Sequence, residues 1–186
     1  PAVGGVVADT DSHIALRHTV IVGAGYQQGH VSGMGIYATS ATVHVDDVWI
    51  ADSHGAGVIA KGPQATIRGR FLQVSRTKVV QMHPAAIWAY SGATLRLVRS
   101  TFDGPVSLDP KAPSAANHAA LGGCAWQGSQ LPAAYPLGVY VTGEATAELA
   151  GCHFAGARGA VASAGGAAIV ALTGVAIVGG ATADDG

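Results

Sequence analysis

The sequence has little charge. Only 11% of its 186 residues are charged, against roughly 25% in ordinary soluble domains, and the formal net charge is -1. No cluster of lysine and arginine is interleaved with aromatic residues, which excludes nucleic acid as the expected partner. Because 49% of the residues are hydrophobic, the chain can bury a core, and an intrinsically disordered chain is excluded as well.

Cysteine is almost absent. Cys124 and Cys152 lie in the similar stretches GCAWQG and GCHFAG, 28 residues apart. Two cysteines are too few for a disulfide scaffold, and they lack the Cys-x-x-Cys spacing of a zinc site. Three interpretations remain from the residues alone: a disulfide, half of a metal site with the adjacent His153, or a repeat in which cysteine occupies one position twice.

Metal-ligand patterns are also lacking. The eight histidines are scattered, and no two of them stand at ligand spacing: His13, His18, His30, His44, His54, His83, His118 and His153. Asp9 and Asp11 in ADTDS are a candidate calcium turn, but no third carboxylate is nearby, so we expect a turn stabilised by aspartate side chains. We therefore expect no metal site and no cofactor.

The sequence shows no secretory leader, since no basic segment precedes the apolar residues after Pro1. We read the chain as a portion of something longer. One uncharged stretch of 25 residues, between Arg158 and Asp184, is long enough for a membrane span. The repeat described next explains the same residues as strands, so we expect no span.

Glycine is abundant, with 27 residues, and a phrase recurs around it. Four copies read GMGIYATSATVHV, GAGVIAKGPQATIRG, PAAIWAYSGATLRL and PLGVYVTGEATAEL. The residue after Ala-Thr is termed the anchor of its repeat; with three weaker copies, the anchors are Ile14, Val43, Ile67, Leu95, Ala119, Ala147 and Val170. Apolar residues alternate with period two after each anchor, which predicts β-strands.

A unit of this length cannot bury its apolar face alone, so stacked copies are expected. The stretches and phrases such as RSTFDG and AGCHFAG resemble right-handed parallel β-helix proteins of the pectate-lyase-like superfold. We predict an all-β, right-handed parallel β-helix solenoid of about seven coils of 23 to 29 residues. It forms a single domain over residues 1–186, part of a longer chain or assembly because no capping helix is evident at either end.

Residues one beyond the anchors should point outward together with charged residues at the strand bends. On the second repeat these outward residues include Asp46 and Asp47. They should lie beside the outward arginines of the next two repeats, which are Arg68, Arg96 and Arg99. The resemblance implies a lyase that uses an arginine as base, so these five are the catalytic candidates. The alternative is a solvated strand face with cross-strand ion pairs, and neighbouring aspartates should point apart.

A second outward column holds Tyr37, Trp88 and Tyr140 on alternate repeats, with rings roughly 10 Å apart for strands spaced about 4.8 Å. This spacing is close to a disaccharide unit, so these rings and His44 are the ligand-binding candidates. The alternative is that β-propensity alone favours the aromatic residues, or that a loop covers them.

Two long turns flank any cleft on this surface. They contribute the polar residues Arg76, Lys78 and His83.

We expect a non-catalytic extracellular or cell-surface module that presents a flat strand face to a polysaccharide or a protein. The alternatives are a polysaccharide lyase or glycoside hydrolase working in a groove along the coils, and a structural component of a fibre or shell that associates through its ends.

The repeat also bears on the cysteines, because both stand five residues beyond an anchor and should be stacked. We expect two buried thiols, since side chains in one parallel column project side by side and a disulfide prefers Cβ atoms about 3.8 Å apart.

Overall fold

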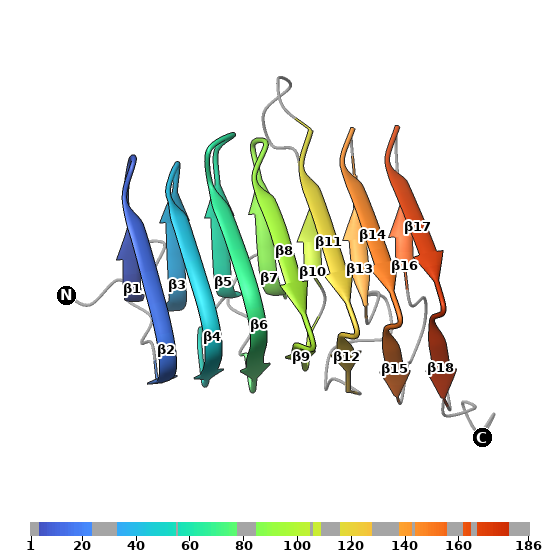
Figure 1. Ribbon diagram of the computed structural model, residues 1–186, viewed down its shortest axis with the longest axis horizontal. Coiled ribbons are helices and arrows are strands. Elements are labelled where there is room, and N and C mark those ends of the chain that lie inside the picture. Colours follow the sequence, from blue (N-terminus) through green and yellow to red (C-terminus); the bar gives the residue numbers. More distant parts are fainter. Residues whose placement is uncertain are drawn as a thin grey trace.

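The structure is a computed structural model that describes residues 4–23, 33–54, 56–77, 85–104, 106–108, 116–127, 138–142, 144–155, 162–164 and 167–178. Every element in these ranges is a β-strand, and every strand pairing is parallel. The strands lie side by side along one axis from the N-terminal to the C-terminal end (Figure 1). The predicted all-β parallel solenoid is thereby confirmed. Within the described ranges the chain forms no helix with the length and apolar character that a membrane span requires.

One sheet has seven strands, which follow one another in chain order. They are β1 (Gly4–Ala8), β3 (Met34–Thr39), β5 (Ala56–Lys61), β7 (Ala85–Tyr90), β10 (Val106–Leu108), β13 (Val139–Val141) and β16 (Ala162–Ala164). Ile36, Val58 and Ile87 stand side by side on its inner surface and are fully buried. β-Branched residues at these positions suit a pleated surface that packs on one side.

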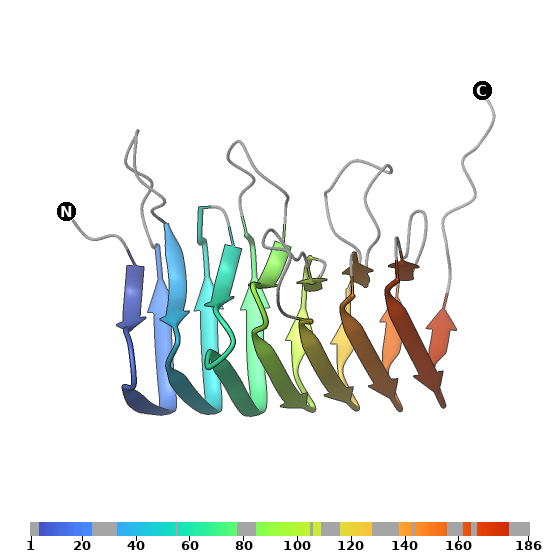
Figure 2. The ribbon, with the colours of Figure 1, turned by 90° about the horizontal axis from the view of Figure 1, so that it is seen from above.

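The other sheet has eleven strands. They are β2 (His13–Val22), β4 (Thr42–Ala51), β6 (Thr66–Ser75), β8 (Thr94–Val98), β9 (Thr101–Phe102), β11 (His118–Gly122), β12 (Ala125–Trp126), β14 (Thr146–Ala150), β15 (His153–Ala155), β17 (Ile169–Thr173) and β18 (Ala176–Val178). β6 pairs with both β8 and β9, and from there the sheet continues as two rows of shorter strands. Figure 2 shows the two sheets from above.

The pairing register matches the columns that the repeat predicted. Val43 aligns with Ile67, Ile67 with Leu95 and Leu95 with Ala119, and all four are buried. Side chains on the two sides of each anchor face outward, so exposed and buried positions alternate along β4 and β8. The sequence therefore determined the register, because a shift by one residue would turn the apolar side chains into solvent.

The core between the sheets changes character along the axis. In the column seven residues beyond the anchors, Ile50 and Val74 give way to Phe102, Trp126 and Phe154. The ring centroids of Phe102 and Trp126 lie 5.2 Å apart, and those of Trp126 and Phe154 lie 4.5 Å apart in a stacked arrangement. An aromatic stack therefore runs along the axis in the later repeats.

Two glycines of the recurring phrase bring the sheets close together. A Cβ atom at Gly35 would collide with Cγ2 of Ile50, and one at Gly57 would collide with Cγ1 of Val74. Gly35 and Gly57 thus leave room for a branched side chain of the opposite sheet.

A corner occurs four residues beyond every anchor, where the backbone takes a positive φ. The residues there are His18, Asp47, Phe71, Arg99, Gly123, Gly151 and Gly174, with φ between 47° and 62°. A left-handed residue bends the strand at this point and separates the two arms of the larger sheet. Glycine suits this conformation because it has no Cβ to clash with the following carbonyl.

Candidate binding face

The outer surface of the larger sheet presents two ordered columns. The column before the anchors contains Thr42, Thr66 and Thr94, which lie on adjacent strands and are partly exposed. The column after the anchors contains His44, Arg68 and Arg96, which are aligned in the same way and exposed. Adjacent strands of a sheet are about 4.8 Å apart, so the threonine hydroxyls form one row along the sheet and His44, Arg68 and Arg96 form a second row parallel to it.

Arg68 and Arg96 have no counter-charge among the residues that the structure describes. They stand directly opposite each other on β6 and β8. No carboxylate of the described residues forms an ion pair with either guanidinium; the ion pairs there use Arg70, Arg76 and His18 instead. Like charges directly opposite each other on a sheet are destabilising, so this pair opposes the fold and calls for an explanation.

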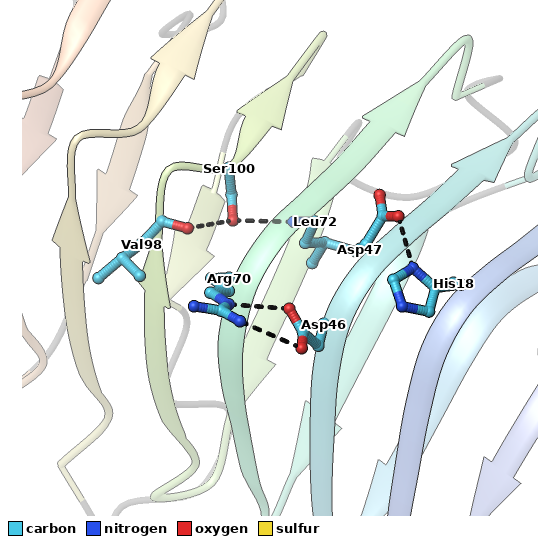
Figure 3. A network of polar contacts seen from close by, with 7 residues as sticks. All are labelled: His18, Asp46, Asp47, Arg70, Leu72, Val98 and Ser100. Carbon is cyan, nitrogen blue, oxygen red and sulfur yellow. Dashed lines mark hydrogen bonds and ion pairs between the residues drawn. The ribbon is translucent and has the colours of Figure 1, made fainter.

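Asp46 pairs with Arg70, three residues beyond the anchors of adjacent repeats. Nε of Arg70 donates to Oδ1 of Asp46 at 2.9 Å, and Nη2 donates to Oδ2 at 3.5 Å (Figure 3). The hydrogen bond from Arg70 lowers the pKa of Asp46, with further contributions from the charges of Arg70, His18 and Arg17. The carboxylate is therefore held as an anion by a two-pronged contact.

Asp47 points to a different partner. Its Oδ2 lies 2.9 Å from Nδ1 of His18 on the preceding repeat, and both residues occupy the positive-φ corner (Figure 3). Asp46 and Asp47 therefore face Arg70 and His18 respectively, as expected for neighbouring residues that point apart. Hydrolysis of a glycoside needs two carboxylates on one cleft, and these two are each engaged elsewhere.

Arg99 and Arg76 lie away from the Asp46 pair. Arg99 occupies the corner of the fourth repeat and is exposed. Arg76 forms a two-pronged ion pair with Asp52, at 3.0 Å from Nε and 2.8 Å from Nη2, and its guanidinium lies 5.7 Å from the ring of Trp49. Lys78 and His83, predicted to stand beside Arg76, lie outside the described residues.

The structure therefore divides the five catalytic candidates. Asp46 and Asp47 have partners other than Arg68, Arg96 or Arg99, and of these two carboxylates only Asp46 contacts an arginine, which is Arg70. A simple signal identifies all three ion pairs: opposite charges at the same offset from the anchors of adjacent repeats. The sequence contained this signal, because Arg76 and Asp52 both stand nine residues beyond their anchors.

The predicted aromatic column is aligned as expected. Tyr37 is opposite Ile59, Ile59 is opposite Trp88, and Tyr140 lies further along the same column. Trp88 is only 8% exposed, and its ring packs against that of Tyr90 at 4.7 Å. The intervening Ile59 is 3% exposed, so the column is a second apolar cluster rather than a row of open rings.

Tyr90 and Tyr37 are linked at the edge of this cluster. Burial raises the pKa of Tyr90 to about 12, and the charge of Tyr37 and a hydrogen bond with its side chain add to the shift. The ammonium of Lys61 lies 5.9 Å from the centroid of the Tyr90 ring. Both tyrosines retain partly exposed surface, whereas Trp88 contributes mainly packing.

Cys124 and Cys152 are free and buried, in the stacked column that the repeat predicted. The Sγ atoms lie 3.6 Å and 3.7 Å from the carbonyl oxygens two residues earlier, Gly122 and Ala150. Ser100 occupies the same position one repeat earlier; its hydroxyl donates to the carbonyl of Val98 and accepts from the amide of Leu72 (Figure 3). A hydrogen bond with Cys152 and burial raise the pKa of Cys124.

Metal ligands do not gather in the part of the chain that the structure describes. No group of three or more histidine, cysteine, aspartate or glutamate residues occurs there in an arrangement that could hold an ion. Oδ1 of Asp9 accepts hydrogen bonds from the amide and the hydroxyl of Thr10, and Asp11 takes a positive φ. These contacts are those of a local turn.

Comparisons with protein-family models, with curated proteins and with solved structures found no match to this chain. The functional interpretation therefore depends on the geometry of the two outer faces.

Proposed function

We propose that the protein is a non-catalytic module that binds an extended polysaccharide or protein along the outer face of the larger sheet. The observation that carries this proposal is the outer surface of β4, β6 and β8, where Arg68 and Arg96 are exposed and form no ion pair with any described residue. Surface groups whose charge opposes folding commonly serve binding. The proposal includes a right-handed helix of the pectate-lyase-like superfold and an extracellular or cell-surface location, where such ligands are accessible.

The charge arrangement supports binding more than catalysis. A hydrolase or lyase needs an acid or base free to exchange protons at the reacting bond. Asp46 and Asp47 are each engaged by a cationic or imidazole partner, and their side chains face different repeats. The alternative of a polysaccharide lyase or glycoside hydrolase would have to use Arg68 or Arg96 without either carboxylate beside it.

A test blocks the face without changing its charge. A cysteine replaces Thr66, in the centre of the face, and is labelled with a polyethylene glycol maleimide. In the control variant a cysteine replaces Lys61 on the other sheet and carries the same label. The native thiols of Cys124 and Cys152 are buried and should not react in the folded protein. A panel of neutral and acidic polysaccharides and of acidic proteins is then screened for binding.

We expect the label at position 66 to abolish binding and the label at position 61 to leave it intact. Equal binding by both labelled proteins would overturn the proposal, as would a panel in which the unlabelled protein binds nothing.

A structural role in a fibre or shell is the second candidate function. Leu172 on β17 and Ile177 on β18 belong to core columns, yet they are 51% and 59% exposed. Apolar surface of this kind favours contact with another β-solenoid surface. Sedimentation at increasing protein concentration tests it: association that Ile177→Asp abolishes supports this role, and a concentration-independent monomer contradicts it.

A further inference from the structure

We infer that Cys124 and Cys152 form a binding site for one soft monovalent cation, such as Cu(I), held between two adjacent repeats. Both side chains belong to the buried core between the sheets, whereas the proposed binding face lies on the outer surface. This inference therefore does not depend on the proposed function. It follows from the alignment of the two cysteines, from the contacts of their sulfurs and from the number of ligands that they offer.

The two cysteines are direct neighbours on adjacent repeats. The amide of His153 donates a hydrogen bond to the carbonyl oxygen of Cys124 at 2.8 Å, and the next residues along the chain, Ala125 and His153, are aligned in the sheet. Cys124 and Cys152 are thus in register, separated by one strand spacing of about 4.8 Å.

Their sulfur atoms also have the same orientation. Sγ of Cys124 lies 3.6 Å from the carbonyl oxygen of Leu97, and Sγ of Cys152 lies 3.3 Å from that of Leu121, the residue aligned with Leu97. Each sulfur contacts the carbonyl oxygen two residues earlier as well, at 3.6 Å and 3.7 Å. Because equivalent contacts recur one repeat later, the two sulfurs are displaced from each other by about one strand spacing.

This displacement suits a metal ion placed between the two sulfurs. A bond from a thiolate sulfur to a metal ion of this size is about 2.3 Å long, so a linear sulfur-metal-sulfur unit spans about 4.6 Å. That span nearly equals the strand spacing of about 4.8 Å. A disulfide bond of about 2.0 Å would require the sulfurs to close more than half of their separation. The ion therefore fits the existing backbone better than a disulfide does.

The number of ligands selects the kind of ion. Among the described residues, no third histidine, cysteine, aspartate or glutamate joins the two sulfurs in an arrangement that could hold an ion. His153 is exposed, although it follows the buried Cys152. Zinc in proteins takes four ligands and calcium takes at least six oxygens, so a site of two sulfurs suits neither. Thiolates select soft ions such as Cu(I), which accepts linear coordination by two sulfurs.

The surroundings of the sulfurs favour the loss of their protons at one of them. A hydrogen bond with the Cys124 side chain lowers the pKa of Cys152, and a hydrogen bond with the Cys124 backbone acts in the same direction. The shared hydrogen bond and burial raise the pKa of Cys124, while a hydrogen bond with the Ser100 backbone opposes them. The cation replaces the thiol protons: two thiols bind one Cu(I), release two protons and leave a single negative charge on the complex.

The experiment titrates the reduced protein with Cu(I), under anaerobic conditions, against a chromophoric Cu(I) chelator. X-ray absorption at the copper edge then counts the sulfur ligands. Cys124→Ser and Cys152→Ser each remove one ligand, and serine already occupies this column at Ser100, so the fold should tolerate both changes. A thiol count on the unfolded protein, without reductant, checks that the native pair is not a disulfide.

Two double variants keep two cysteines and serve as matched controls. Ser100→Cys with Cys152→Ser recreates an adjacent pair one repeat earlier. Ser100→Cys with Cys124→Ser places the two thiols two strand spacings apart, about 10 Å, which a linear unit does not span. Circular dichroism and urea unfolding verify that all variants are folded.

We expect the unaltered protein to bind one Cu(I) per chain through two sulfurs. Both single variants and the separated pair should lose at least about a hundredfold in affinity, because even groups that only support metal ligands contribute about 10- to 100-fold. The shifted adjacent pair should keep most of the affinity. Ag(I), used as a redox-inert probe, should raise the unfolding temperature of the adjacent-pair proteins and not that of the separated pair.

Equal affinity of the adjacent and separated pairs would overturn the inference, since binding would then depend on the number of thiols alone. So would a copper spectrum with three or four ligands, an unaltered protein that takes no Cu(I) from the chelator, or the absence of free thiols in the unfolded, unreduced chain.

Discussion

The first three repeats and the later ones satisfy the same columns with different side chains. In the larger sheet, β2, β4 and β6 are continuous strands of ten residues, whereas each later repeat forms two short strands over the same stretch. The early corners hold His18, Asp47 and Phe71, and the last three hold glycine. The early core is aliphatic, and the later core is an aromatic stack.

The difference teaches that the solenoid constrains backbone shape and side-chain direction more than residue identity. Every repeat needs a left-handed residue at the corner and an apolar group seven residues beyond the anchor. Histidine, aspartate and even phenylalanine meet the first need at a cost, and valine or tryptophan meets the second. Neither requirement applies to the outward positions. The early repeats place charged residues there, and all three ion pairs of the described residues lie in these repeats.

The aromatic stack gives the largest expected effect. Trp126 is fully buried between Phe102 and Phe154, so Trp126→Ala should lower the free energy of unfolding by about 3 to 5 kcal/mol. In the same column of an early repeat, Ile50→Val should cost only about 1 kcal/mol. Urea denaturation of the two variants measures the contrast; equal losses would show that the aromatic stack adds nothing to the column.

The column of Ser100 and Cys124 should show a smaller effect. Ser100→Ala leaves the buried amide of Leu72 without its hydroxyl acceptor, which should cost about 1 to 3 kcal/mol. Cys124→Ala removes weak thiol contacts to Gly122, Leu97 and Cys152 and should cost less, because a thiol is a poor donor. A lower denaturation midpoint for Cys124→Ala than for Ser100→Ala would contradict this order.

The corners should separate backbone strain from packing. A Cβ at Gly123 would meet no atom closer than Cγ of Arg99 at 3.7 Å, so Gly123→Ala changes little besides the backbone preference. We expect a loss of about 1 to 2 kcal/mol from the left-handed conformation. Phe71→Gly should instead raise the free energy of unfolding, since a bulky residue now occupies the same left-handed conformation at φ 54°. Thermal unfolding of both proteins tests this; a neutral Gly123→Ala would remove the strain argument.

The Asp46 pair should give the smallest effect, and a pH-dependent one. The pKa of Asp46 is lowered in the folded protein, so its contribution to stability is present above its unfolded pKa near 3.8 and is lost as the pH falls through the folded value. Asp46→Asn should therefore narrow the difference between urea midpoints at pH 5 and at low pH. Urea midpoints of both proteins are compared across that range. The same pH-dependent difference in Asp46→Asn as in the unaltered protein would mean that the exposed pair contributes nothing to stability.

Much of the fold was predictable because the period of two and the spacing of the anchors both constrain it. Val43, Ile67 and Leu95 were placed in one buried column from sequence alone, and the structure aligns them. The two stacked thiols followed from the same alignment. The candidate site was harder, because outward columns carry no burial requirement. The alignment predicted that His44, Arg68 and Arg96 are neighbours and placed Asp46 opposite Arg70, but it did not decide whether Asp46 pairs with Arg70 or with Arg17 on its other side.

The sequence by itself determined the strands, the parallel stacking and the register, since each depends on apolar groups recurring at fixed offsets along the chain. Only the tertiary structure decided which of two possible partners a charged residue pairs with and which surface is open. Trp88 points outward as predicted, yet packing with Tyr90 and Ile59 leaves it nearly buried. Arg68 and Arg96 remain exposed because carboxylates of the neighbouring columns reach other partners. Burial and the choice between two possible ion-pair partners depend on distances of a few ångströms between strands, which no periodicity in one chain specifies.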